Sequence, residues 1–150
     1  MLIVGIDPGF SGAWGMIDHH GKYWSCGDMH NNKSVIDTRA VYAEMMQARD
    51  GQDCDVVIES VHAMPGQGVS STFKFGMAFG AALALAERFG TSVHMVSPWQ
   101  WKKPLQLDSD KDKSLALARE LWPNAPLKRK KDNGRAEALL MAYWWLKESQ

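Results

Sequence analysis

The chain opens with Leu2-Ile3-Val4-Gly5-Ile6-Asp7-Pro8-Gly9. Its apolar, partly β-branched run is typical of a buried strand, and the Pro8-Gly9 pair ends that run with a turn signal. Asp7 closes the strand, so we expect its carboxylate at the edge of a sheet beside loops, where open α/β sheets bind ligands. The opening stretch therefore predicts a sheet with an acidic group at its ligand-binding edge.

A second predicted strand ends in the same way. Residues 55–59 (Asp-Val-Val-Ile-Glu) form a short apolar run whose last residue, Glu59, is acidic. Two carboxylates on neighbouring strands resist joint ionisation unless a cation lies between them. Because no cluster of His or Cys accompanies them, oxygen ligands favour magnesium or manganese over zinc. Each acid taken alone would more often be a turn or cap residue.

The remaining elements follow from hydrophobic periodicity and turn residues. Strands are predicted over residues 2–7, 12–18, 22–29, 55–59 and 91–96, and helices over residues 37–49, 72–89, 98–101, 110–121 and 135–147. Short turns separate the first three strands, which should pair antiparallel, whereas the later strands alternate with helices and require parallel pairing. This order predicts an α/β protein with a five-stranded mixed sheet flanked by helices, in a single domain over residues 1–150.

Composition agrees with one folded domain. The 150 residues are 45% hydrophobic and 23% charged, which excludes a disordered chain. Cys26 and Cys54 have no metal-ligand spacing and no disulfide framework, which favours a reducing compartment. The longest nearly unbroken apolar run, residues 77–86, is shorter than the roughly 20 residues of a membrane span. The N-terminus has no basic flank or cleavage region, so we expect a cytoplasmic protein that does not enter a membrane.

Charge is balanced overall but uneven along the chain. The formal net charge is zero, which argues against a protein that coats nucleic acid indiscriminately. Residues 1–70 hold 4 Lys or Arg and 9 Asp or Glu, a net of −5, whereas residues 99–135 hold 10 and 5, a net of +5. An acidic half facing a basic half suits a site with cations at its centre and phosphates at its rim, although an unevenly charged solvated surface gives the same count.

Three motifs follow one another along the chain. They are Gly5-Ile6-Asp7-Pro8-Gly9-Phe10-Ser11-Gly12-Ala13, Val57-Ile58-Glu59 and Lys130-Lys131-Asp132-Asn133-Gly134-Arg135-Ala136-Glu137-Ala138-Leu139-Leu140. Together they resemble the RuvC family of Holliday junction resolvases, within the RNase H-like superfamily, over nearly the whole chain. The compact form looks like a bacteriophage-type member, for which the cytoplasm would be that of the host cell.

This resemblance implies an RNase H-like fold and a homodimeric endonuclease that resolves four-way DNA junctions by symmetric cuts and leaves 5′ phosphates. Asp7 and Glu59 are similar to the first two metal-binding acids of the family, and Glu137 lies where the family places an Asp followed by Ala-Leu. The implied cofactor is a pair of Mg²⁺ ions in each active site, with Mn²⁺ as a substitute, in a two-metal hydrolysis.

The fourth acid of the family pattern is harder to assign. Its usual place, three residues before Glu137, is Gly134 here, and Asp132 is the alternative catalytic and metal-binding candidate. An offset of five residues turns about 140° on an ideal helix, so Asp132 and Glu137 share a site only if Asp132 precedes the regular helix. Asn133, four residues before Glu137, is the other possible ligand.

Basic and aromatic residues extend the implied site. Lys113 matches a family lysine close to the metal ions and would neutralise charge on the reacting phosphate. The implied DNA contacts are His62, Phe73, Lys74, Lys102, Lys103, Lys128, Arg129, Lys130 and Lys131. Aromatic residues stack on unpaired bases and basic residues contact the phosphates. The competing interpretations are a turn residue at position 62, a solvated face beside Trp99 and Trp101, and a plain linker over residues 128–131.

Gly76, Gly80 and Ala84 recur at four-residue spacing in one predicted helix. Small residues at this spacing let a second helix approach closely, either from the same chain or across a twofold interface. In a soluble protein the stripe usually means packing within the chain. The alternative is a twofold interface, which the homodimer implied by the resemblance supports, since two symmetric cuts require two sites.

Other functions stay open on the sequence alone. Gly5-Ile6-Asp7-Pro8-Gly9 also resembles the first phosphate loop of the actin-like ATPases, but these need two such domains and a second phosphate loop. An RNase H-like nuclease acting on flaps or bubbles would use the same acids. A catalytically inert branched-DNA-binding module would need the basic and aromatic residues but not the three acids together, and would bind equally well in a chelator.

Overall fold

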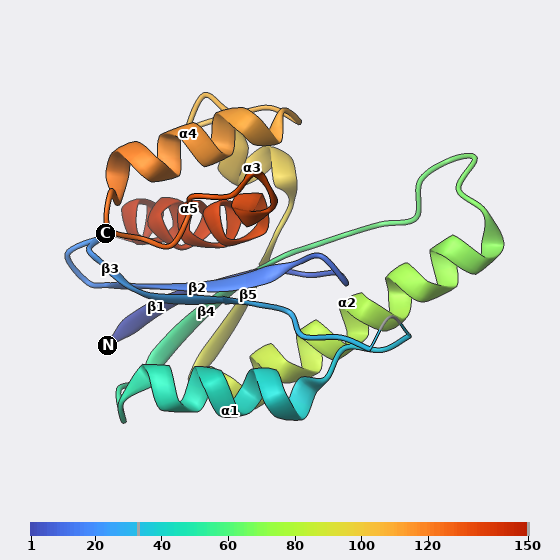
Figure 1. The fold of residues 1–150 in the computed structure, drawn as a ribbon, viewed down its shortest axis with the longest axis horizontal. Helices are drawn as coiled ribbons and strands as arrows, with labels where there is room; N and C mark the ends of the chain where they lie inside the picture. The colour runs from blue at the N-terminus through green and yellow to red at the C-terminus, as the bar shows by residue number, and fades with distance from the viewer. Residues whose placement is uncertain (33, 150) are drawn as a thin grey trace.

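A computed structural model describes residues 1–32 and 34–149. A five-stranded sheet carries helices on both faces (Figure 1). The strands are β1 (Leu2–Asp7), β2 (Ala13–Asp18), β3 (Tyr23–Asp28), β4 (Cys54–Glu59) and β5 (Ser92–Val96). The helices are α1 (Thr38–Arg49), α2 (Val69–Phe89), α3 (Pro98–Lys102), α4 (Lys111–Leu121) and α5 (Asn133–Glu148), and a short 3-10 turn, η1 (Lys130–Asp132), precedes α5.

The strand order is β3-β2-β1-β4-β5. β2 pairs antiparallel with both β1 and β3, whereas β4 runs parallel to both β1 and β5. This topology confirms the predicted mixed sheet, including the antiparallel arrangement of its first three strands. Ile6 lies opposite Ile58 in the parallel pair, so the residues that follow them, Asp7 and Glu59, come to the same edge of the sheet.

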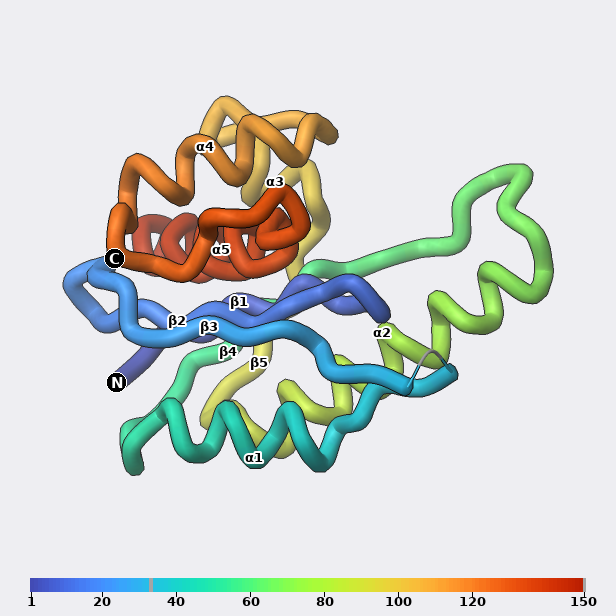
Figure 2. The backbone as a smooth tube through the Cα atoms, in the orientation of Figure 1, coloured from blue at the N-terminus to red at the C-terminus, as the bar shows by residue number. Residues whose placement is uncertain are grey.

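Two hydrophobic cores lie on the two faces of the sheet. α1 and α2 cover one face, and α3, α4 and α5 cover the other (Figure 1, Figure 2). Leu2, Val4 and Ile6 belong to the core on the α1/α2 side, and Ile3 belongs to the core on the α5 side. Because side chains alternate along a strand and β1 is covered on both faces, its sequence is a continuous apolar run rather than an alternating one.

The close packing of α5 on β1 depends on Gly5. A Cβ atom at this position would lie 1.8 Å from the carbonyl oxygen of Ala138, so any larger residue would push the helix away from the sheet. The contact brings the first turns of α5, which include Glu137, toward the carboxyl end of β1. A glycine inside the first strand therefore helps to assemble the acidic site.

Helix α2 starts earlier than predicted. It begins at Val69 rather than at residue 72, and Gly68 at its N-cap offers no side-chain hydrogen bond, so the sequence carries no start signal there. Its buried residues lie between Ala78 and Phe89, and the part of the helix before them extends beyond the sheet (Figure 1). By length and composition alone α2, with 21 residues and a mean hydropathy of 1.3, is sufficient to cross a membrane. The second half, however, packs in the domain core.

Candidate active site

Asp7 is the centre of an acidic cluster. Burial, together with the negative charges of Glu137 and Glu59, raises the pKa of Asp7 to about 8. Within residues 1–32 and 34–149 the Asp7 carboxylate forms no hydrogen bond or ion pair. Asp7 therefore needs either a proton or a cation, as expected for a carboxylate that shares a site with two others.

Glu59 is oriented by helix α3. The indole Nε1 of Trp101, a fully buried side chain, donates a hydrogen bond of 2.8 Å to Glu59 Oε2. Burial raises the pKa of Glu59, and the Trp101 hydrogen bond and the charge of Lys102 oppose that rise. A neutral donor from a packed side chain thus fixes one oxygen of this acid without neutralising it.

Glu137 is engaged by two helices. Lys102 Nζ, at the end of α3, lies 2.8 Å from Glu137 Oε1, and Ser114 in α4 donates its hydroxyl to the same oxygen at 3.2 Å. Glu137 is only 4% exposed. A carboxylate this deep in a protein requires such partners, because an unpaired buried charge is costly.

The donor chemistry of the cluster fits a divalent cation. Three carboxylates with no His or Cys among them are the oxygen ligands that Mg²⁺ and Mn²⁺ prefer, and Asp7 has no other counter-charge in contact. In the part of the chain that the structure describes, no three acidic, His or Cys side chains stand close enough together to hold an ion. Glu59 and Glu137 are turned to Trp101 and Lys102 instead, so an ion would bind only after side-chain movement.

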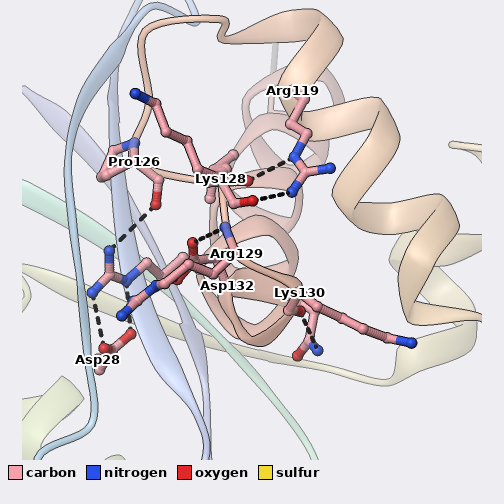
Figure 3. Close-up of polar contacts among 10 residues, drawn as sticks. Asp28, Arg119, Pro126, Lys128, Arg129, Lys130 and Asp132 are labelled. Carbon is pink, nitrogen blue, oxygen red and sulfur yellow. Dashed lines mark hydrogen bonds and ion pairs between the residues drawn. The ribbon is translucent and has the colours of Figure 1, made fainter.

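Asp132 does not join this cluster, which corrects the prediction made for it. Arg129 binds both of its oxygens: the backbone N donates to Oδ2 at 2.7 Å, and the guanidinium Nε and Nη2 donate to Oδ1 at 3.0 and 2.7 Å (Figure 3). Burial opposes ionisation of Asp132, but these hydrogen bonds hold its pKa below the usual range. Asp132 therefore stabilises the turn η1 by accepting these hydrogen bonds from Arg129. Asn133, the other possible ligand, donates its side-chain amide to the carbonyl of Lys130.

Gly134 occupies the position that faces Asp7. A Cβ atom at residue 134 would lie 3.5 Å from Asp7 Oδ2 and 3.0 Å from the carbonyl oxygen of Ser11. This position points at the cluster but contributes no side chain. The site therefore contains three carboxylates, from β1, β4 and α5.

Lys113 also lies outside the cluster, contrary to the prediction. Its ammonium forms an ion pair with Asp108, and both side chains are exposed. Lys111 and Lys102 are instead the lysines whose charges lower the pKa of Asp7. Residues two apart on a helix point in nearly opposite directions, so Lys111 and Lys113 at the start of α4 cannot both face the acids.

The predicted DNA contacts fall into separate groups. Lys102 is largely buried on Glu137 and is not free for a phosphate. Lys103 is exposed, with its Nζ 4.6 Å from the ring centroid of Trp99. His62, Phe73 and Lys74 are exposed on the loop after β4 and on the first half of α2, which extends away from the sheet (Figure 1).

The basic run before α5 remains available to a ligand. Lys128, Lys130 and Lys131 are exposed, and none of them forms an ion pair with the described residues. Arg129 differs, because its guanidinium is held by Asp132. In Figure 3 the Lys128 and Lys130 side chains point away from this ion pair. Three of the four basic residues of this run therefore present a charge that is not paired within the described residues.

Three residues of the site were missed by the sequence interpretation. Nothing in the sequence distinguishes Trp101 from Trp99, or Lys111 from Lys113, as a residue of the site. Ser114 did carry a signal, since it is a polar residue on the buried face of α4, beside Leu115 and Ala118.

Known proteins resemble this chain in both sequence and fold. A stretch of 93 residues is 38% identical to the chloroplastic Holliday junction resolvase MOC1 of Chlamydomonas reinhardtii; it covers 59% of this chain and 10% of that protein. The chain thus spans about a tenth of the length of this curated relative. No protein-family model matches the chain.

Two solved structures of RuvC from Thermus thermophilus share the fold. RuvC in complex with a Holliday junction substrate superimposes with a TM-score of 0.67 at 20% identity, over 96% of this chain and 92% of that one. A second RuvC structure gives a TM-score of 0.62 at 21% identity, over 99% and 97% of the two chains. Both matches extend over nearly the whole chain. This chain therefore has the RNase H-like fold of the RuvC resolvases.

Proposed function

We propose that this protein is a structure-selective endonuclease that resolves four-way DNA junctions by metal-dependent phosphodiester hydrolysis, leaving 5′-phosphate ends. The observation that carries the proposal is the convergence of Asp7, Glu59 and Glu137 at one edge of a RuvC-like sheet, with Asp7 lacking any counter-charge in contact within the described residues. The partial likeness to a Holliday junction resolvase supports four-way junctions as the substrate class.

Asp7, Glu59 and Glu137 are the residues that would hold Mg²⁺ or Mn²⁺. A pair of divalent ions activates water and stabilises the leaving oxygen in phosphodiester hydrolysis. Trp101 holds one Glu59 oxygen through a hydrogen bond, which leaves the other oxygen available to an ion. Ser114 holds one oxygen of Glu137 in the same way. Lys111 is exposed and its charge acts on Asp7, so it is suited to attract the phosphate.

The exposed basic and aromatic residues provide the DNA-binding surface. Lys128, Lys130 and Lys131 lie in the segment leading into α5, the helix that carries Glu137, so they are suited to hold the backbone beside the scissile phosphate. His62, Phe73 and Lys74 lie on the projecting loop and helix, where an exposed aromatic ring is suited to stack on an unpaired base at the branch point.

Two copies of the chain would provide the paired cuts. Gly76, Gly80 and Ala84 are exposed, and nothing lies within 4 Å of a Cβ built at either glycine. The two glycines therefore face open space, whereas Ala84 lines a surface pocket together with Tyr42 of α1. Met77 beside Gly76 is also exposed. These exposed small residues along one side of α2 support a twofold helix contact between protomers.

Cleavage of a mobile four-way junction tests the proposal. The junction, a matched linear duplex and a flap are incubated with the protein in Mg²⁺, in Mn²⁺ or in chelator, and the strands are resolved on a denaturing gel. We expect symmetric nicks in the junction alone, only with metal, and none with Asp7→Asn. Asp53→Asn, which alters an exposed acid away from the cluster, should cut normally.

Each other result identifies a competing function. Equal cutting of the flap would indicate a general branched-DNA nuclease. Tight junction binding that is unchanged by chelator, without cutting in any metal, would indicate an inert binding module. Cutting by Asp7→Asn would exclude the proposed metal site.

A further inference from the structure

Lys102 occupies an unusual position for a lysine. Its side chain is 15% exposed, and its ammonium lies 2.8 Å from Glu137 Oε1, while the Glu137 side chain is 6% exposed. Nearby Lys103 and Lys111 are exposed. Lysine is seldom buried without a specific partner. Here the partner is one of the three acids of the cluster.

The charge of Lys102 acts on the whole cluster. Burial and the two glutamates raise the pKa of Asp7, and burial raises that of Glu59; the Lys102 charge opposes both rises. Three carboxylates in one low-dielectric site repel each other strongly unless a positive charge lies among them. In the DNA-free protein Lys102 supplies that charge.

Glu137 cannot bind the Lys102 ammonium and a divalent ion through the same oxygen at once. The oxygen nearest Lys102 also accepts the Ser114 hydroxyl, so it is already doubly engaged. A divalent ion that binds Glu137 through this oxygen would lie at contact distance from the ammonium, where two positive charges repel. The described residues hold no group of three acids close enough to enclose an ion, which agrees with Glu137 being turned to Lys102.

We infer that Lys102 is the resident cation of the acidic cluster, which holds Glu137 when no divalent ion is bound and must be displaced when one binds. Lys102 is thus a positioning residue that sets how tightly the protein takes up metal, rather than the DNA contact that the sequence suggested. This inference rests on the proposed metal site. It predicts a competition that is measurable without DNA and without catalysis.

The test is a calorimetric titration of the DNA-free protein with Mn²⁺ at low ionic strength. Lys102→Met keeps most of the side-chain length but removes the charge, so it should bind Mn²⁺ about tenfold more tightly, which corresponds to about 1.4 kcal/mol. Lys102→Arg keeps the charge and should bind like wild type. Lys103→Met removes the neighbouring exposed charge over Trp99 and should also bind like wild type.

Thermal melting gives an independent readout. In chelator, Lys102→Met should melt below wild type, because Glu137 has lost its counter-charge, and saturating Mn²⁺ should raise its midpoint more than that of wild type. If this variant fails to fold, Lys102→Gln, which keeps a hydrogen-bond donor toward Glu137 without charge, should show the same tightening.

Unchanged or weaker Mn²⁺ binding by a folded Lys102→Met or Lys102→Gln protein would overturn the inference and leave the metal site intact. Asp7→Asn separates the two proposals. If this variant binds Mn²⁺ as well as wild type does, or if wild type binds no Mn²⁺, both the metal site and the inference about Lys102 are wrong.

Discussion

Replacing Asp7 with Asn should stabilise the metal-free protein. Burial and the two neighbouring glutamates raise the pKa of Asp7 from 3.8 to about 8. At pH 7 Asp7 is therefore protonated in the folded protein and ionised in the unfolded chain. Because pH 7 lies about three units above the unfolded pKa, this protonation costs the folded state about 4 kcal/mol. Asn avoids this cost, but a buried amide without a partner loses about 1–3 kcal/mol. The expected net gain is about 2 kcal/mol, or about 4–8 °C in the melting temperature.

The pH dependence follows from the direction of the shift. Because the folded pKa lies above the unfolded value, the contribution of Asp7 to stability is fully present below pH 4 and is lost as the pH rises through about 8. The advantage of the Asn variant should therefore grow between pH 5 and pH 8. Urea unfolding followed by tryptophan fluorescence in chelator measures it, with Asp53→Asn as the exposed control. A variant that is less stable than wild type at pH 8, or a difference that is independent of pH, would refute the reasoning.

Four further substitutions test other parts of the site. Glu59→Gln should lower the single-turnover nicking rate at least about 100-fold while junction affinity in a gel-shift assay stays within about threefold; retained nicking would remove Glu59 from the metal site. Trp101→Phe removes the donor to Glu59 and should slow nicking about tenfold, at a stability cost of about 1–2 kcal/mol; an unchanged rate would mean that this hydrogen bond does not orient the acid. Gly134→Asp places a carboxyl group beside Asp7 and should tighten Mn²⁺ binding in calorimetry while lowering stability in chelator; weaker binding would show that the position does not face the ion. Gly80→Arg fills an open helix surface and should yield monomers in light scattering with unchanged Mn²⁺ affinity, whereas a persistent dimer would place the interface elsewhere.

The sheet and two of its acids could be predicted because the relevant signals are local. Residues 2–7 and 55–59 are apolar runs that end at acids, and parallel strands bring such ends to one edge of a sheet. The motif around Glu137 provided the third acid through its resemblance to a family. These features need only strand polarity and chain order.

The partners of the acids could not be predicted, because they depend on side-chain directions. Asp132 was expected at the metal, but the tight turn η1 lets Arg129 reach both of its oxygens. Lys113 was chosen over Lys111, and the choice depends on which side of α4 faces the sheet. Lys102 reaches Glu137, 35 residues away in sequence, only because α3 and α5 pack on the same face.

The most direct measurement is anomalous diffraction from crystals of the wild-type protein grown or soaked with Mn²⁺. We expect anomalous density between Asp7, Glu59 and Glu137, with Glu137 turned toward the ion, and no density there in crystals of Asp7→Asn. Mn²⁺ bound only at other surface acids, with these three side chains arranged as in the metal-free protein, would contradict the central claim that they form one metal-binding site.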